Sequence, residues 1–151
     1  MTTATQPTLT VEEHRWLLNA YLNFDPYDST ILTKADRQLA DGLASKGLAE
    51  IRELGRTQYL YPTVNGNNWL RDHAGEDNCL PNRNNRFWRN ILAGETAVNI
   101  PSEDLWLNEY EELILLGILD DRRNYDDRDV TATLTPHGAD MRDFADSRLS
   151  Q

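Results

Sequence analysis

The sequence is poor in the residue types that build redox and membrane sites. It has one cysteine, Cys79, so an internal disulfide and any site made of several cysteines are excluded. Its longest apolar run, residues 113–119, is far shorter than the roughly 20 residues that a membrane-spanning helix needs. Residues 1–10 contain no basic region and no apolar stretch, so no signal peptide is expected. These absences favour a soluble, cytoplasmic protein.

Positive charge is scarce, and the scarcity is local. The chain has 25 acidic and 15 basic side chains, a net charge of −10. Residues 1–72 hold nine acids and seven bases, residues 73–101 hold three of each, and residues 102–151 hold thirteen acids and five bases. A bias of the whole proteome would spread acidity along the chain, so this concentration favours a local purpose, although such blocks also occur as solvated faces. An acidic surface repels phosphate, which disfavours nucleic-acid binding.

Two stretches of the chain match in order and spacing. The first combines LASKGLAEI with QYLYPTVNGNNWLRD, and the second combines LILLGILDD with VTATLTPHGADMRDF. Gly47 corresponds to Gly117 and Gly66 to Gly138, with two extra residues between the glycines of the second copy. Each copy is typical of a helix that ends at a glycine, a strand, a turn, a returning strand and a Gly-containing turn into another helix. The chain is therefore predicted to contain two related units.

Helix signals surround each copy. Apolar residues at four-residue spacing predict a helix that begins near Thr33 and ends at Gly47. A second helix is expected after Ser102 as its N-cap, with Gly117 as its end. A leading helix is expected before each copy, over residues 11–22 and residues 85–93.

Alternating apolar and polar side chains predict the strands. Residues 47–53 and 57–63 alternate in this way, and residues 121–129 are expected to form the polar loop of a longer second hairpin. The expected division is a flexible tail over residues 1–10, unit one over residues 11–72, a linker rich in Gly, Asn and Pro over residues 73–84, and an acidic unit two over residues 85–146.

The order of helices, two-stranded wing and closing helix resembles the winged-helix superfamily. SKGLAEI with YLYPTVNGNNWL, and LLGILDD with ATLTPHGADM, look like the helix end, wing and LTPxG signature common in its regulators. The likeness covers residues 11–72 and 83–146, and it implies a helix-dominant α+β fold with two winged-helix-like units in tandem. Winged helices bind DNA, RNA and other proteins, so the fold leaves the function open. Tandem winged helices also occur in partners of chromosome-organising kleisins, which implies an adaptor as one function.

DNA binding would depend on the basic side chains of the first unit. A winged helix that reads DNA places its third helix in the major groove and its wing on the backbone. A solvated helix face is the alternative interpretation of the same residues. The third helix of unit two offers acids and no base, which argues against groove reading there. The candidate DNA-binding set of unit one is Lys34, Arg37, Gln38, Arg52 and Arg56.

The acids of unit two form the candidate partner-binding face. They fall on the expected third helix and in the expected wing, where carboxylates can occupy a groove made for nucleic acid. The chain is similar in size and charge to the small acidic inhibitors that phages and mobile elements use against CRISPR or restriction complexes, which is an analogy only. The expected face comprises Glu103, Asp104, Glu109, Glu111, Glu112, Asp120, Asp121, Asp126, Asp127 and Asp129.

Two further groups of side chains have alternative interpretations. Arg83, Arg86 and Arg89 recur every three residues, and they can meet phosphate or pair with the acids of unit two; we favour pairing. Packing explains most of the four tryptophans, but an exposed one would indicate a protein interface. The tryptophans, all expected on helices, are Trp16, Trp69, Trp88 and Trp106.

Recognisable catalytic motifs are missing from the sequence. The densest group of reactive side chains contains His73, Glu76 and Cys79, and a polar connecting loop explains it. There is no Gly-rich phosphate loop, no GxSxG and no HExxH. We therefore expect no enzyme, cofactor or metal. The expected function is a protein-binding module that engages a basic protein surface, with a DNA-binding regulator or a tandem winged-helix adaptor as alternatives.

The charge distribution predicts that the chain does not bind duplex DNA at physiological salt. Non-specific binders reach Kd values of about 1–100 µM there through Lys and Arg contacts to phosphate. Residues 90–121 contain neither Lys nor Arg. We expect no change in the fluorescence anisotropy of a labelled duplex at these concentrations. Submicromolar binding to a defined duplex that is lost in Arg37→Ala would contradict this prediction and support the regulator.

Overall fold

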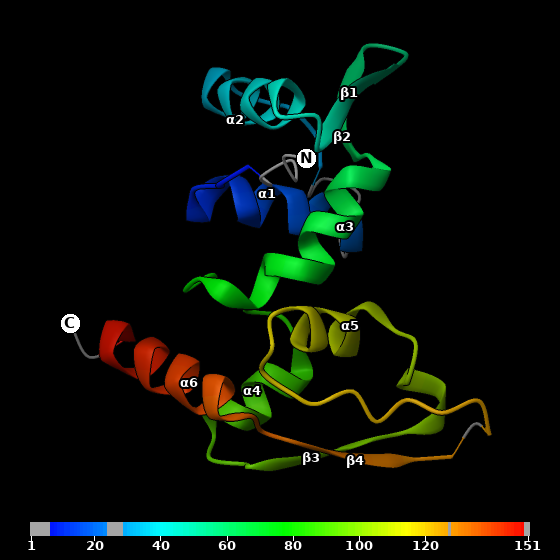
Figure 1. Ribbon diagram of the computed structural model, residues 1–151, viewed down its shortest axis with the longest axis vertical. Coiled ribbons are helices and arrows are strands. Elements are labelled where there is room, and N and C mark those ends of the chain that lie inside the picture. The colour runs from blue at the N-terminus through cyan, green and yellow to red at the C-terminus, as the bar shows by residue number, and fades with distance from the viewer. Residues whose placement is uncertain (1–6, 24–28, 127, 150–151) are drawn as a thin grey trace, which may run out of the picture. The chain divides into compact units, whose positions relative to one another are not determined.

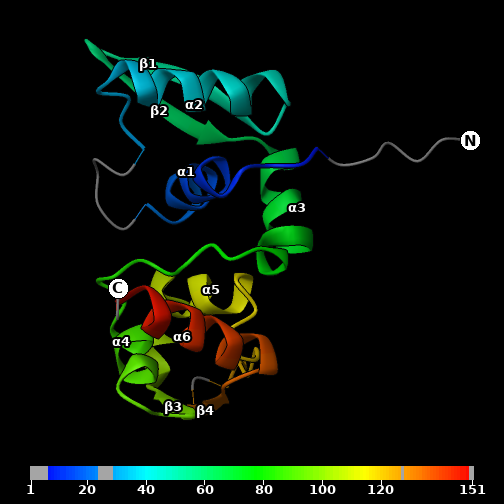
Figure 2. The same ribbon diagram turned by 90° about the vertical axis from the view of Figure 1, so that its left-hand side faces the viewer.

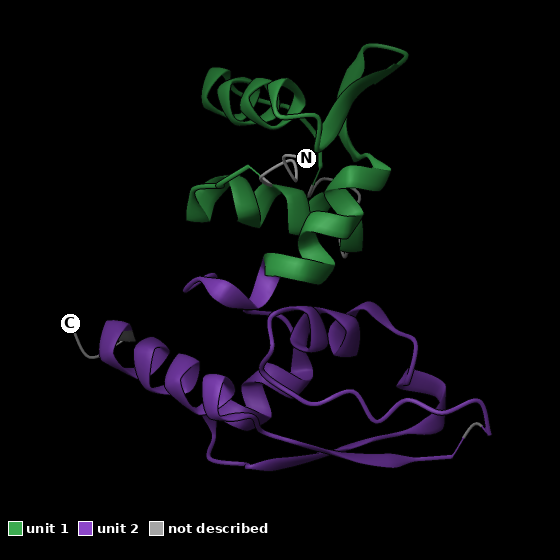
Figure 3. Ribbon diagram, viewed as in Figure 1, with its two compact units in different colours: residues 1–73 green, residues 74–151 purple. Residues whose placement is uncertain are grey.

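Each half of the chain folds around a core of its own. The computed structural model describes residues 7–23, 29–126 and 128–149. It divides the chain into unit one, residues 1–73, and unit two, residues 74–151 (Figure 3). About half of the chain is helical, and the described residues form six α-helices and two small antiparallel sheets, which confirms the α+β class (Figure 1). No helix in the described ranges is long and apolar enough to cross a membrane.

Unit one combines three helices with a short hairpin. The first two helices each begin with a capping box, in which Thr10 pairs with Glu13 and Thr33 with Asp36, so the expected N-cap at Thr33 is confirmed. The elements are α1 (Val11–Leu22), α2 (Lys34–Ser45), β1 (Ala49–Leu54), β2 (Thr57–Pro62) and α3 (Val64–His73).

Unit two also combines three helices with two paired strands. Asn85 caps its first helix, because the Asn85 side chain accepts hydrogen bonds from the backbone of Phe87 and Trp88. The elements are α4 (Arg86–Leu92), β3 (Ala97–Ile100), the 3₁₀ turn η2 (Ser102–Asp104), α5 (Asn108–Leu115), β4 (Val130–Thr133) and α6 (Pro136–Leu149). A further 3₁₀ turn, η1 (Ala74–Glu76), precedes them in a segment that was expected to be part of a linker.

Unit two departs from the expected elements before α5. The helix expected directly after Ser102 is broken into η2 and α5, and Ser102 lies inside η2 rather than capping it. Tertiary contacts hold the first turn separately, because the backbone N–H of Ser102 donates to Asp129 at 2.8 Å and Asp104 pairs with Arg86. Trp106, expected on a helix, therefore lies between η2 and α5.

The pairing of the strands in unit two also differs from the expected hairpin. The strand expected after Gly117 is reduced to one bridge between Leu119 and Leu134, and β4 pairs instead with β3. β3 was not predicted, although its alternation of buried Val98 and Ile100 with exposed neighbours is typical of a half-buried strand. A pattern of four residues is too short to distinguish a strand from a loop by alternation alone.

The two units nevertheless share one order of elements (Figures 1 and 2). In unit one, β2 has β1 on one edge and Thr30 on the other, where Thr30 forms a bridge with Tyr59. In unit two, β4 has β3 on one edge, and the backbone N–H of Asp120 donates to Thr133 on the other. Each unit is thus helix, strand segment, helix, strand segment, returning strand and closing helix, and the units differ in which partner of the returning strand is longer.

A threonine and a glycine fasten the closing helix of unit one. The Thr63 hydroxyl donates to the carbonyl oxygen of Gly47 at 2.7 Å and accepts from the backbone N–H of Gly66 at 3.1 Å. The backbone N–H of Thr63 donates to Leu48 at 3.0 Å. These bonds tie the end of α2 and the start of α3 to the same threonine.

The same bonds recur in unit two. The Thr135 hydroxyl donates to the carbonyl oxygen of Gly117 and accepts from the backbone N–H of Gly138 at 2.8 Å. The backbone N–H of Thr135 donates to Ile118 at 3.0 Å. The glycines that match in sequence therefore occupy corresponding places, and Gly66 and Gly138 lie inside the first turn of a helix rather than in a turn before it.

Glycine is required at two of these places because backbone meets backbone. A Cβ atom at Gly66 would lie 2.0 Å from the carbonyl oxygen of Leu48, and one at Gly138 would lie 2.3 Å from that of Ile118. Gly47 has a left-handed φ of 75°, which suits the end of a helix. We refer to the threonine, the two glycines and their bonds in each unit as the Thr–Gly lock.

Replacing Gly66 with alanine is expected to destabilise the protein by about 3 kcal/mol, because the methyl group must displace a backbone carbonyl. Gly47→Ala is the matched control. Its left-handed backbone costs alanine about 1–2 kcal/mol, but the added methyl group meets no atom within 4 Å. Urea unfolding followed by circular dichroism measures both losses, and a Gly66→Ala loss no larger than that of Gly47→Ala would contradict the close approach.

Candidate functional site

The structure divides the expected acidic face between the interior and the surface of unit two. Glu112 on α5 is 0% exposed, and Asp104 is also buried. The Glu112 carboxylate accepts hydrogen bonds from the backbone N–H of Asn82 and from the side-chain amide of Asn85, both at 3.0 Å. Glu112 therefore holds the segment before α4 against α5 and cannot contact a partner.

Arginine side chains neutralise several of the other acids. The Arg86 guanidinium lies 2.9 Å from Glu109 and 3.3 Å from Asp104, and the hydrogen bond that Arg86 donates to Glu109 is the main reason that the pKa of Arg86 is raised. The favoured interpretation, that Arg83, Arg86 and Arg89 pair with the acids of unit two, is thus confirmed for Arg86. Arg89 donates instead to the carbonyl oxygen of Arg83 at 3.2 Å.

A second arginine binds two acids beneath an aromatic ring. Arg123 pairs with Asp121 at 2.9 Å and with Glu111. The hydrogen bond between Arg123 and Asp121 lowers the pKa of Asp121 and raises the pKa of Arg123. The guanidinium carbon of Arg123 lies 4.9 Å from the centroid of the Trp106 ring. The charge of Arg123 is therefore fully engaged by its own unit.

The loop before β4 is also held by backbone contacts. The Tyr110 hydroxyl donates to the carbonyl oxygen of Asp120 at 2.8 Å and accepts from the backbone N–H of Arg122 at 2.9 Å, and burial raises the pKa of Tyr110. The Asp120 carboxylate accepts from Arg122 at 2.7 Å and from the backbone N–H of Thr133 at 2.8 Å. Asp120 therefore also has a structural role.

Two aromatic side chains of unit two are left exposed. Trp106 is 51% exposed and Tyr125 is 92% exposed, and their rings stack with centroids 5.6 Å apart at an interplanar angle of 30°. Trp69 and Trp88 are buried, as expected of packing residues. We call Trp106 and Tyr125 the aromatic pair. Tyr125 was missed from the sequence, although a lone aromatic within a run of charged residues was a usable signal.

The remaining acids of the expected face lie on the two segments that carry the aromatic pair. Glu103 and Asp126 are exposed and form no ion pair within the described part of the chain. Asp129 is exposed and accepts the hydrogen bond from Ser102, which joins the two segments. We call Glu103, Asp126 and Asp129 the flanking acids. Asp127 lies outside the described residues.

The basic side chains of unit one are partly engaged with neighbouring groups. Arg37 pairs with Asp41 at 3.0 Å and donates to Gln58 at 2.7 Å. Arg52 pairs with Glu50, and its guanidinium carbon lies 4.3 Å from the centroid of the Tyr61 ring. The other members of the candidate DNA-binding set, all exposed, are Lys34, Gln38 and Arg56.

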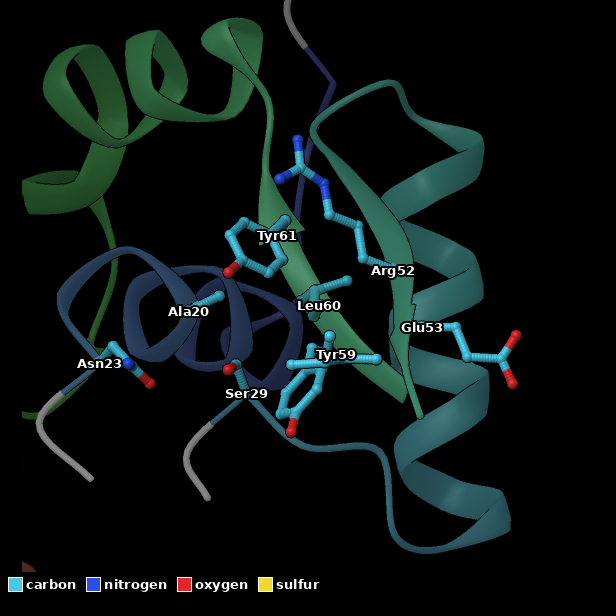
Figure 4. A pocket seen from close by; sticks show the side chains of 9 residues that line it. Ala20, Asn23, Ser29, Arg52, Glu53, Tyr59, Leu60 and Tyr61 are labelled. Carbon is cyan, nitrogen blue, oxygen red and sulfur yellow. The ribbon is translucent and has the colours of Figure 1, made fainter. Parts of the chain in front are cut away.

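A pocket of about 370 Å³ lies in unit one beside β2 (Figure 4). Arg52 extends toward the ring of Tyr61, and the carboxylate of Glu53 points away to the other side of the sheet (Figure 4). The described residues that line it include no histidine and no cysteine. The lining comprises Ala20, Asn23, Ser29, Arg52, Glu53, Leu54, Tyr59, Leu60 and Tyr61.

The reactive side chains near the boundary of the units are divided between them. His73 ends α3 in unit one, where its ring lies 5.6 Å from that of Trp69. Glu76 ends η1 in unit two, and Cys79 is a buried thiol of the same unit. The surface of unit two around the aromatic pair is thus the candidate functional site. No protein-family model, curated protein or solved structure matches the chain.

The burial of Glu112 predicts a large loss of stability on replacement. Glu112→Leu is expected to cost about 2–4 kcal/mol, because the buried donors of Asn82 and Asn85 lose their acceptor. Glu112→Gln should cost less, since one amide oxygen can accept from both. Glu103→Leu, on an exposed acid, is the control and should stay within about 0.5 kcal/mol of the parent. Thermal unfolding measures all three, and an unchanged Glu112→Leu would show that the carboxylate is not a buried acceptor.

Proposed function

We propose that this chain is a non-enzymatic protein-binding module whose second unit engages a basic protein surface. The observation that carries the proposal is the aromatic pair, which stays exposed within an acidic segment. Residues 102–129 contain ten acids and three bases, a formal charge of −7. Large aromatic side chains are enriched at the centres of protein interfaces, and an acidic surround selects a partner of opposite charge.

The finer form of the fold belongs to the same proposal: two winged-helix-like units in tandem. The shared order of elements and the Thr–Gly lock in each unit support it. In a winged helix the helix before the hairpin and the hairpin itself face the bound molecule. Trp106 precedes α5 and Tyr125 lies in the loop before β4, so the aromatic pair belongs to the corresponding parts of unit two.

One use of such a surface is mimicry of nucleic acid. Exposed carboxylates beside planar rings resemble phosphates beside bases, and they would compete for a groove lined with Arg and Lys. The partner would then be a nucleic-acid-binding complex, which this chain inhibits. An adaptor of a larger assembly would use the same surface, but its partner would bind nucleic acid and this chain together, so competition separates the two roles.

A DNA-reading regulator that uses unit one is the weaker proposal. Arg37 and Arg52 are held by Asp41 and Glu50, which lowers the positive charge available to phosphate. Lys34 and Arg56 would have to supply most of the electrostatic attraction.

Charge reversal at the flanking acids tests the protein-binding proposal. A partner is captured from the native host or its target cell, and its association rate is measured across salt concentrations. Glu103→Lys with Asp126→Lys should slow association about tenfold or more at low salt, because steering is lost. The matched control is Glu95→Lys with Asp140→Lys, which changes the net charge equally at two other exposed acids of unit two. If the Glu103→Lys, Asp126→Lys variant associates as fast as the parent protein, the acidity only solubilises the protein. Equal slowing by the control variant would show that net charge, and not the flanking acids, sets the rate.

A further inference from the structure

We infer that the aromatic pair is a binding site for an arginine side chain of the partner, so that unit two selects arginine-bearing over lysine-bearing segments. The inference rests on the proposed protein-binding function and goes further, because it names the group that is recognised. An acidic surface alone attracts any cation. The arrangement of Trp106, Tyr125 and their neighbouring carboxylates adds a shape and a π surface to that charge.

The geometry leaves aromatic surface open to a ligand. The two rings stack on each other, yet 51% of Trp106 and 92% of Tyr125 remain accessible. Because Arg123 already lies over Trp106, the flat face that is left open belongs to Tyr125, and it presents the negative quadrupole of its ring to solvent. Such a face attracts a cation that lies over it.

The chain itself already contains the arrangement that we propose for the partner. Arg123 lies over Trp106 while Asp121 and Glu111 bind its guanidinium. In unit one, Arg52 lies over Tyr61 and pairs with Glu50. Each case combines a planar guanidinium, an aromatic ring and a carboxylate.

The charge around the aromatic pair is not balanced by these internal contacts. Arg123 carries one positive charge against the two carboxylates that it binds, Glu111 and Asp121. Glu103 and Asp126, on the same segments as the aromatic pair, add two exposed carboxylates that form no ion pair within the described ranges. The site therefore offers both the ring face and the carboxylates that a further guanidinium needs.

Arginine fits this site better than lysine for physical reasons. A guanidinium is planar, weakly hydrated and able to bind a carboxylate through two N–H groups while its face lies on a ring. An ammonium is compact and strongly hydrated, so it gains less from the ring. We expect the preference to be about twofold to fivefold in Kd at an exposed site. Stacked nucleic-acid bases are the competing ligand for exposed aromatics, but the acidic segment repels their phosphates.

Two peptides of equal length and charge test the inference. One alternates arginine with glycine and the other lysine with glycine, and each is titrated into the full chain at low ionic strength. The parent protein should bind the arginine peptide about twofold to fivefold more tightly. Tyr125→Ala should reduce the affinity for the arginine peptide to that for the lysine peptide. The matched control is Tyr61→Ala, an exposed tyrosine of unit one, which should change neither affinity.

The outcomes separate the inference from the proposed function. Equal binding of both peptides, unchanged by Tyr125→Ala, would contradict the arginine-binding site but would still agree with a basic protein partner. Binding of neither peptide overturns both. Tighter binding of a single-stranded oligonucleotide than of the arginine peptide would also contradict the arginine-binding site. Because Tyr125 is almost fully exposed, its replacement leaves the fold intact. Replacing Glu103 with Gln and Asp126 with Asn should weaken both peptides, and the arginine peptide more, because a guanidinium binds a carboxylate through two N–H groups.

Discussion

The closing helix of each unit can approach its neighbour only where a glycine lets two backbones meet. At Gly66 and Gly138 the space for a side chain is taken by a carbonyl oxygen, and a threonine hydroxyl binds both sides of the contact. This Thr–Gly lock fixes the middle helix, the returning strand and the closing helix together. The lock is the same in both units, whereas their helices, strands and loops differ in length. The aromatic pair lies in segments of unit two that are outside the lock.

Net charge overstates how much negative charge unit two offers to a partner. Glu112 is buried and accepts hydrogen bonds inside the unit. Arg86 forms ion pairs with Glu109 and Asp104. Arg123 forms ion pairs with Glu111 and Asp121. Pairing of this kind reduces self-repulsion and leaves the fold free of the cost of many like charges. Of the remaining acids of the expected face, Glu103, Asp126 and Asp129 are exposed, and they lie on the segments of the aromatic pair. The surface is therefore a specific combination of rings and carboxylates rather than a general polyanion.

Local signals made part of this structure predictable. Gly47 and Gly117 were expected as helix ends because a left-handed residue there has a sequence signature, and Thr33 was expected as a cap for the same reason. The burial of Glu112 was missed because its partners lie about 30 residues away in sequence. The break before α5 was missed because contacts with Arg86 and Asp129 decide it. The periodicity of apolar residues depends only on neighbours along the chain, so it does not indicate partners that are distant in sequence.

We propose that unit two recognises a basic protein segment through the aromatic pair. An NMR titration of the isotope-labelled chain with an arginine-rich peptide tests it most directly, because the indole N–H signals of the four tryptophans are separately observable. The account predicts that the signals of Trp106 and of the Tyr125 backbone shift, while those of the buried Trp69 and Trp88 stay in place. Shifts centred instead on Lys34 and Arg56 of unit one, or no shift at Trp106, would contradict it.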